Sequence, residues 1–239
     1  IDMIVFNTDF EEDYNIILNA VESGEISRER LDEAVTRILA LKVKVCFDNT
    51  SVTLTDKRKK VEELADDSVT LVKNIGNILP VTSDRYPEIR LVLLGNDTLG
   101  DGNSAVEVAT RELEKRGFRV KLYVREDDDM HGVKELSDKR LTLYIANEPT
   151  ESNRTTVRLS WNPKHAMDAP RYINEEPSVF LSVYNPYHLQ DVPAVKVYVN
   201  AYSPTKVNIE AAIAKLAGES PFKGKSPVDA FCGLEDTRY

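Results

Sequence analysis

Two glutamates follow one of the most apolar segments of the chain. Glu148 and Glu151 lie in "ANEPTESNR", directly after "LTLYIA" at residues 141–146. If that apolar segment is a strand, both carboxylates lie at its carboxyl end, where a glutamate could act as a general acid. A solvated loop explains the same residues and is favoured by the local pattern. The general acid therefore remains an alternative.

The three histidines are widely separated and show neither the HxH nor the HExxH spacing of a metal site. His131 follows an acidic run and is expected at the surface, and His165 lies far from the other two. His188 is the most informative, because it stands in "YNPYHLQDVP" immediately after an apolar segment. A structural role is favoured over a ligand or catalytic role there, and no GxSxG motif supports a serine hydrolase.

A glycine-containing loop, "GNDTLGDG" at residues 95–102, falls between an expected strand and an expected helix. A loop in that place can bind phosphate through backbone N–H groups. It lacks the Gly-Lys-Ser/Thr of a P-loop, and its glycines at 95, 100 and 102 do not fit GxGxxG. An ordinary turn between strand and helix is the favoured interpretation.

Composition and charge narrow the class of protein. The chain has 239 residues, 41% of them hydrophobic and 30% charged, with a net charge of -9. Such a charge argues against nucleic acid or an anionic membrane as the main partner. The acidic run at residues 126–129 is expected to be a solvated loop, so no metal site is predicted. Cys46 and Cys232 have no CxxC spacing and are expected to be reduced and buried.

The helices and strands that must position these residues are predicted to form an α/β domain. Apolar segments of strand type are "SVTLVKNIGNILPV", "RLVLLG", "RVKLYV", "LTLYIA", "SVFLSV" and "KVYVNA". Helical patterns lie mostly between them, including residues 57–67, 104–117 and 207–219. This alternation predicts a mainly parallel sheet of five or six strands with helices on both faces, a three-layer α/β/α sandwich. Residues 149–177, with a possible strand "TTVRLSW", are interpreted as an insertion.

The first 50 residues have a different pattern of apolar and polar residues. Residues 1–6, "IDMIVF", read as a strand covered on both faces. Two helical patterns follow with a break at Ser23-Gly24, and a polar linker comes after them. A strand of this kind needs neighbouring strands, so we expect the chain to be the end of something longer.

The final third resembles the end of the C-terminal domain of glycoside hydrolase family 3. That family has a strand ending in Asn-Pro-Tyr, a proline, a strand ending in Ala-Tyr, a helix, a Gly-Glu pair and a closing Gly-Lys-x-Pro-Val. The matching residues here are Asn185-Pro186-Tyr187, Pro193, Ala201-Tyr202, Gly218-Glu219 and Gly224-Lys225-Ser226-Pro227-Val228. "SVTLVKNIGNILPV" resembles the start of the same domain in the family. "IDMIVF" with "AVESGEISRERLDEAVTRILALKVKVCF" resembles the last strand and helices of its (β/α)8 barrel.

The resemblance implies three parts and a function. Residues 1–50 would be a remnant of the barrel, 51–65 a linker and helix start, and 66–239 the sandwich domain. The implied activity is retaining hydrolysis by an exo-acting β-N-acetylhexosaminidase, and the "SNRTTVRLSW" insertion favours that branch over β-glucosidases. The nucleophilic aspartate would lie on the barrel, outside this chain, and Asp2 and Asp9 do not match its motif. The chain alone would then be inactive, with no cofactor.

Site residues and partners follow from the same resemblance. In glucosidase-like members the acid/base is a glutamate of the second domain, for which Glu148 and Glu151 are the candidates. Asn185, Tyr187 and His188 are candidates for substrate binding or domain contact. The expected partners are the missing barrel, a carbohydrate substrate and, through residues 1–45, a second copy of the chain.

Two other functions remain open from the sequence, and so does the compartment. The chain could be a free-standing carbohydrate-binding or scaffolding domain of the same fold. A flavodoxin-like nucleotide-binding protein rests only on the sheet pattern and the loop at residues 95–102. Either a cytoplasmic or a secreted location is compatible with the sequence.

Overall fold

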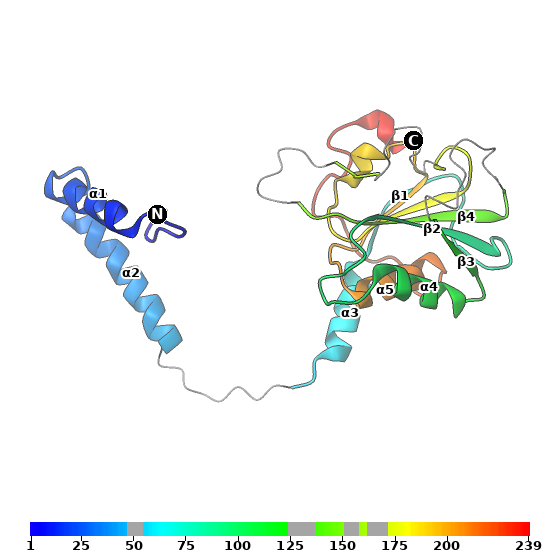
Figure 1. The fold of residues 1–239 in the computed structure, drawn as a ribbon, viewed down its shortest axis with the longest axis horizontal. Coiled ribbons are helices and arrows are strands. Elements are labelled where there is room, and N and C mark those ends of the chain that lie inside the picture. Colours follow the sequence, from blue (N-terminus) through cyan, green and yellow to red (C-terminus); the bar gives the residue numbers. More distant parts are fainter. Residues whose placement is uncertain (47–54, 124–136, 151–157, 162–171) are drawn as a thin grey trace. The chain divides into compact units, whose positions relative to one another are not determined.

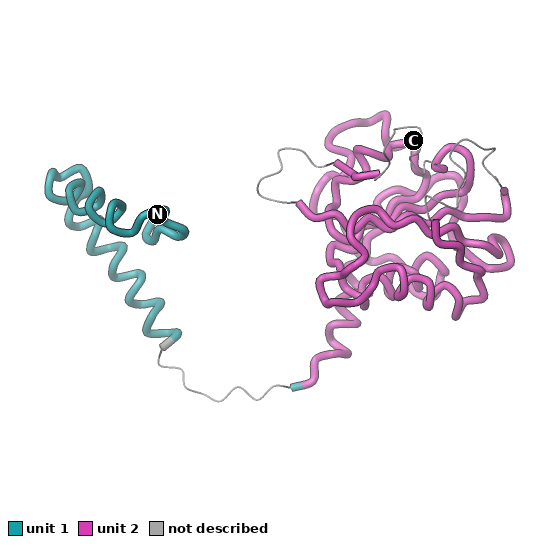
Figure 2. The backbone as a smooth tube through the Cα atoms, in the orientation of Figure 1, with its two compact units in different colours: residues 1–55 teal, residues 56–239 magenta. Residues whose placement is uncertain are grey.

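The computed structural model describes residues 1–46, 55–123, 137–150, 158–161 and 172–239 of the chain (Figure 1). These residues divide into two compact units, residues 1–55 and 56–239 (Figure 2). None of the helices within these ranges is both long and apolar enough to cross a membrane.

The first unit is a pair of helices, α1 (Phe10–Glu22) and α2 (Arg28–Cys46). Asp9 caps α1, where its Oδ1 accepts hydrogen bonds from the N–H groups of Glu11 and Glu12 at 2.9 and 3.0 Å. The helices are separated where the sequence predicts a break, and Gly24 has a φ of 79° there. No residue of α1 is buried, so the pair has little core of its own.

The strand expected at residues 1–6 is not formed. These residues have no regular secondary structure, and Ile1 and Phe6 are almost fully exposed. A strand needs a neighbour for its backbone N–H and C=O groups, and the described part of this unit offers none. The Asp2 carboxylate instead bonds to α2, with 3.1 Å between its Oδ2 and Nη1 of Arg37.

The second unit is built on a six-stranded sheet with the order β1-β6-β5-β4-β2-β3. The strands are β1 (Thr70–Asn74), β2 (Glu88–Gly95), β3 (Arg119–Leu122), β4 (Arg140–Asn147), β5 (Ser178–Ser182) and β6 (Val197–Asn200). Neighbouring strands are parallel except β1, which pairs antiparallel with β6. The predicted α/β fold with a mainly parallel sheet is confirmed.

The two faces of this sheet are covered differently. The helices α3 (Arg58–Ser68), α4 (Ala105–Glu114) and α5 (Lys206–Leu216) lie together on one face (Figure 1). Ser104 caps α4 by accepting from the Glu107 N–H at 3.0 Å. Among the described residues, the other face has the 3₁₀-helix η2 (His188–Asp191) and irregular segments. Helices on both faces were expected, but no α-helix lies on this second face within the described ranges.

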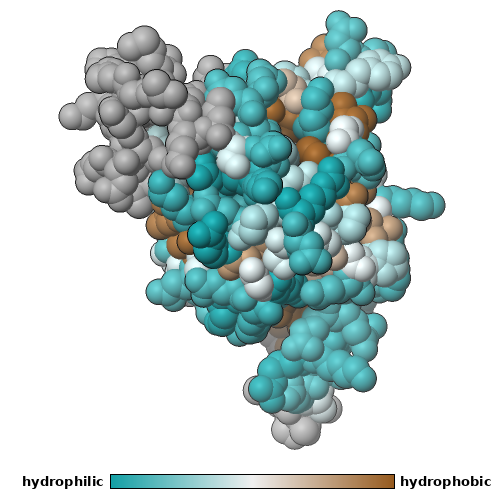
Figure 3. All heavy atoms as spheres, turned by 90° about the vertical axis from the view of Figure 1, so that its right-hand side faces the viewer, coloured by the Kyte–Doolittle hydropathy of each residue, from teal (hydrophilic) through white to brown (hydrophobic). Residues whose placement is uncertain are grey.

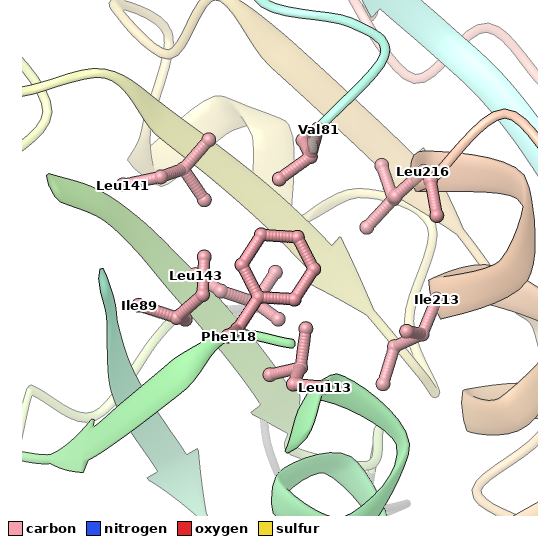
Figure 4. A pocket seen from close by; sticks show the side chains of 9 residues that line it. Val81, Ile89, Leu113, Phe118, Leu141, Leu143, Ile213 and Leu216 are labelled. Carbon is pink, nitrogen blue, oxygen red and sulfur yellow. The ribbon is translucent and has the colours of Figure 1, made fainter. Parts of the chain in front are cut away.

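The core between the sheet and the helices is continuous and apolar. Figure 4 shows side chains from β2, β4, α4 and α5 pointing toward one another around Phe118. The gap that they leave is about 10 Å³, no more than a single water molecule needs. Its lining is entirely apolar, so it is a small packing defect and not a ligand site.

The second face of the sheet is built around aromatic side chains. Tyr144, Phe180 and Tyr198, from three adjacent strands, stack with ring centroids 5.7 and 5.5 Å apart. The C-terminal segment packs over the same face through Ala230 and Phe231. Beneath it the buried ammonium group of Lys73 donates to the carbonyl oxygens of Pro193, Thr237 and Tyr239.

A buried ion pair joins the amino ends of the strands. Nη1 of Arg90 on β2 lies 2.6 Å from Oε2 of Glu176, and both side chains are almost fully buried. Thr142 on β4 donates to the same carboxylate at 3.0 Å. This pair links two neighbouring strands to the segment that leads into β5.

The face in Figure 3 is mainly hydrophilic, with hydrophobic residues in separate spots.

Cys232 is an exposed free thiol, so the expectation that it is buried is wrong. It lies in a turn of the C-terminal segment with a φ of 51°, where its Sγ accepts from Nε2 of Gln190 at 2.9 Å. The side chain of Cys46 is outside the described part of the structure.

Candidate functional site

The carboxyl edge of the sheet gathers most of the candidate residues. β2, β4, β5 and β6 run parallel, so their carboxyl ends meet at one edge, with Gly95 beside Asn147 and Ser182 beside Asn200. In open α/β sheets this edge is where ligands bind. The loops after these four strands therefore define the candidate site.

The loop after β2 is an ordinary turn and not a phosphate cradle. The N–H groups of Leu99 and Gly100 donate to the carbonyl oxygens of Asn103 and Pro204, at 2.8 and 2.7 Å. Those of Thr98 and Asn103 donate to nearby side-chain oxygens. Because its amides already have protein acceptors, the loop presents few donors to a phosphate.

Gly95 allows the ends of β2 and β4 to come close together. Its φ is 87°, and a Cβ there would lie 2.4 Å from the carbonyl oxygen of Asn147 and 2.6 Å from Cγ of Glu148. Only glycine accepts both the left-handed backbone and this contact. The Asn147 side chain holds the other side of the junction, with Nδ2 donating to the carbonyl oxygens of Asn96 and Thr98 at 2.7 and 3.1 Å.

Glu148 lies at the predicted place, after the carboxyl end of β4, but its carboxylate faces inward. The residue is 5% exposed, and its Oε1 and Oε2 lie 2.7 and 3.0 Å from the backbone nitrogen of Ser160. A carboxylate bound in this way is an anchor for the neighbouring segment. Its role as an acid/base group remains a prediction, and Glu151 lies outside the described residues.

The Asn185-Pro186-Tyr187 turn follows β5 at the same edge and is hydrogen-bonded to side chains of β6. The Pro186 carbonyl oxygen accepts hydrogen bonds from the Tyr198 hydroxyl at 3.3 Å and from Nδ2 of Asn200 at 3.4 Å. Oδ1 of Asn185 accepts from the Tyr187 N–H at 3.0 Å. Asn185 is buried, whereas Pro186 and Tyr187 are half-buried, so solvent reaches the second and third residues of the turn.

His188 is buried behind this turn, 1% exposed. Burial lowers the pKa of its imidazole to about 4, which keeps the ring neutral near pH 7. Its Nδ1 contacts the hydroxyl of Ser182, and that hydroxyl donates to the carbonyl oxygen of Asn185 at 2.6 Å. Ser182 is buried and its hydroxyl already donates to a backbone carbonyl oxygen. It is therefore not placed to act as a nucleophile.

Other candidates from the sequence are not brought to this edge. Asp2 and Asp9 lie in the first unit, where one bonds to α2 and the other caps α1. His131, His165 and the acidic run at residues 126–129 fall outside the described residues. Within the described ranges, no group of histidine, cysteine and carboxylate side chains could hold a metal ion.

Sequence reasoning missed two residues of the edge. The Asp191 side chain is 7% exposed and accepts the Leu159 N–H at its Oδ2, at 2.8 Å. Asn200 ends β6, and its Oδ1 has no hydrogen-bond partner among the described residues although it is buried. Both residues lie in segments that the sequence analysis quotes, "YNPYHLQDVP" and "KVYVNA", but nothing in those segments singles them out.

The described structure also has an open pocket of about 330 Å³ near the amino edge of the sheet. Val81 and Phe118 form part of its wall, and Arg116 and Glu219 belong to its polar lining. Arg116 is already bonded to Glu219 through two hydrogen bonds of 2.7 Å each. Its guanidinium is therefore occupied by a carboxylate of the same chain.

Comparison with known proteins gives two close similarities and one of fold alone. No protein-family model matches the chain. A curated "Beta-N-acetylglucosaminidase/beta-glucosidase" from Cellulomonas fimi is 36% identical over 255 aligned positions, which cover 99% of this chain and 45% of that protein. A solved "Beta-glucoside phosphorylase BglX" is 36% identical with a TM-score of 0.76, and covers 99% of this chain and 45% of its own.

A second solved structure supports the fold. The glycoside hydrolase family 3 β-N-acetylglucosaminidase from Paenibacillus sp. str. FPU-7 has a TM-score of 0.54 at 22% identity, covering 88% of this chain and 41% of its own. The chain thus spans less than half the length of each of these relatives.

Proposed function

We propose that this chain, whose homologues and structural neighbours are glycoside hydrolase family 3 proteins, is the C-terminal part of an enzyme that cleaves terminal β-linked sugars. The observation that carries the proposal is the 36% identity to the Cellulomonas fimi protein along 99% of the chain. The order of motifs from Asn185 to Val228 supports the same conclusion.

The substrate that we propose is terminal β-linked N-acetylglucosamine, with β-glucosides as the alternative. The Cellulomonas fimi protein carries both activities in its name. The reaction is a retaining one, in which an aspartate attacks the anomeric carbon and a proton donor assists the leaving oxygen. In this proposal the aspartate belongs to the barrel and not to these 239 residues.

The described domain contributes binding and positioning to that reaction. At the carboxyl edge Glu148 is bonded to a backbone N–H, and His188 is neutral and enclosed. Tyr187, which is half-buried, remains as a residue of the turn that can contact a sugar. These features favour a domain that shapes one side of a substrate cleft.

The first unit supplies a surface for the rest of the enzyme. Met3, Val5 and Phe10 are at least half exposed, and so are Leu39 and Leu41 on α2. Exposed apolar groups in such numbers are typical of an interface. We propose that they contact the barrel of the same protein.

A chimera tests the proposed function. The C-terminal part of the Cellulomonas fimi protein that aligns with this chain is replaced by the chain, and the product is assayed with aryl β-N-acetylglucosaminide and aryl β-glucoside. Each assay is run in water alone and with added inorganic phosphate, because one relative at 36% identity is a phosphorylase. We expect turnover, with the larger kcat/KM for the N-acetylglucosaminide.

The chain alone is the matched control. We expect no turnover from it, because loss of a covalent nucleophile lowers the rate by roughly 10⁴ to 10⁶. A folded chimera that cleaves neither substrate would contradict the proposed function. Turnover by the chain alone that is lost with Glu148→Gln would move the acid/base chemistry into this domain.

A further inference from the structure

A short segment at residues 158–161 packs onto the second face of the sheet without forming a strand. Leu159 is 8% exposed and belongs to the apolar cluster of that face. Trp161 meets Tyr144 edge-on, with ring centroids 6.1 Å apart. Ser160, between them, is exposed. We call residues 158–161 the strap.

Two buried carboxylates from different elements hold the backbone of the strap. Oδ2 of Asp191, at the end of η2, accepts the Leu159 N–H at 2.8 Å, while Oδ1 pairs with the Arg158 guanidinium. Glu148, directly after β4, accepts the N–H of the next residue, Ser160. Hydrogen bonds with an ionised acceptor are stronger than those between neutral groups. Consecutive N–H groups are therefore fixed to two different loops of the carboxyl edge.

The backbone around Glu148 is built to allow this contact. Gly95 has no side chain where a Cβ would overlap Cγ of Glu148 and the carbonyl oxygen of Asn147. Asp191 in turn ends the 3₁₀-helix that follows the Asn185-Pro186-Tyr187 turn. The strap is thus attached both to the end of β4 and to the element that carries the turn.

We propose that Glu148 and Asp191 are positioning residues that hold the strap at the carboxyl edge, where Ser160 and the strap backbone form one wall of a glycoside-binding surface. The ligand class in this proposal rests on the proposed function, whereas the attachment of the strap rests on the contacts alone. On this reading Glu148 acts through the strap and does not itself transfer a proton.

The attachment is tested on the full chain by the fluorescence of Trp161, which is the sole tryptophan. In Glu148→Ala and Asp191→Ala the strap loses a charged acceptor, which favours its release by roughly tenfold or more. We expect the Trp161 emission to shift to longer wavelength and the amide hydrogens of Leu159 and Ser160 to exchange faster. Glu148→Gln keeps an acceptor oxygen and should show a smaller change.

Glu219→Gln is the matched control, because that carboxylate bonds to Arg116 at the helical side of the sheet. It should leave the Trp161 emission unchanged. If the alanine variants fail to fold, Glu148→Gln combined with Asp191→Asn keeps the side-chain shapes and is measured in their place. Folded variants with wild-type emission and wild-type amide exchange would overturn the attachment.

The wall is tested in the chimera described above. We expect Glu148→Ala to raise KM roughly tenfold while kcat changes little, as loss of binding in both ground and transition states predicts. A general acid at Glu148 would instead lower kcat by orders of magnitude and remove one limb of the pH profile. If the Glu148→Ala chimera is active with an unchanged KM, the strap does not form a wall of the binding surface. An inactive chimera with the unsubstituted chain would instead contradict the proposed function, and the fluorescence and exchange measurements on the strap would still stand.

Discussion

Nδ1 of His188 lies 2.9 Å from the hydroxyl oxygen of Ser182, and both side chains are about 1% exposed. The Ser182 hydroxyl donates to the Asn185 carbonyl oxygen, so the hydrogen between serine and histidine must come from Nδ1. The imidazole is therefore the neutral Nδ1–H tautomer. The hydrogen bonds from His188 to Ser182 and from Ser182 to Asn185 therefore join the turn after β5 to the core only while the imidazole is neutral.

Protonation of His188 should destabilise the second unit. Its pKa is about 4 in the folded chain and near 6.5 when unfolded, so the unfolded state binds more protons between these values. Stability is then fully present above about pH 6.5 and falls as the pH is lowered toward 4. The loss should reach about 2 kcal/mol at pH 5.

Urea unfolding of the wild type and of His188→Gln at pH 7 and pH 5 measures this loss. The variant lacks the titrating ring, so it should lose less stability than the wild type over the same interval. Carboxylates contribute equally to both proteins and cancel in the difference. Equal losses in the two proteins would show that His188 does not carry this pH dependence.

Gly95→Ala should destabilise the junction of β2 and β4. The added Cβ must occupy a left-handed backbone position and overlap the Asn147 carbonyl oxygen. We expect a loss of more than about 2 kcal/mol in the free energy of unfolding. Gly102→Ala is the control, since it has a similar φ of 81° but no atom within 4 Å of its Cβ position. That control should lose only about 1 kcal/mol, and equal losses would argue against the overlap.

Glu176→Gln should destabilise the amino ends of the strands. The change removes the charge that neutralises the buried Arg90 guanidinium, and breaking a buried pair from one side costs about 3–5 kcal/mol. Thermal or urea unfolding measures the loss. Glu175→Gln, at the exposed neighbouring position, should change stability by less than about 0.5 kcal/mol. A Glu176 variant as stable as that control would mean that the pair is not buried in solution.

Apolar segments predicted the six strands of the second unit well but failed at residues 1–6 and 158–161. "LTLYIA" and "SVFLSV" become β4 and β5, and every residue of these strands is buried. "IDMIVF" has the same character and forms no strand, because pattern alone does not supply a partner. In the possible strand "TTVRLSW", residues 158–161 form no strand, and the N–H groups of Leu159 and Ser160 bond to carboxylates instead.

The location of the candidate site could be predicted from the sequence, but the contacts within it could not. Glu148 and the turn after β5 were expected at strand ends, and parallel pairing brings those ends to one edge. The partners of Glu148 and Asp191 lie 12 and 32 residues away, at Ser160 and Leu159. No local pattern encodes such pairings, since they depend on how an insertion packs onto an aromatic face.

The last prediction concerns the exposed apolar residues of the first unit. Val5, Phe6 and Phe10 are 65%, 98% and 77% exposed, and no residue of α1 is buried. Exposed apolar area is unfavourable by roughly 25 cal/mol per Å². The purified chain should reduce this area by self-association through residues 1–45, with collapse onto the second unit as the competing outcome. Sedimentation of the full chain distinguishes them, because only self-association raises its mass with concentration. A version beginning at Thr55 is the control and should be monomeric in either case. A full chain that sediments as a monomer at every concentration, with amide exchange in α1 as slow as in β4, would rule out association and favour the collapsed form.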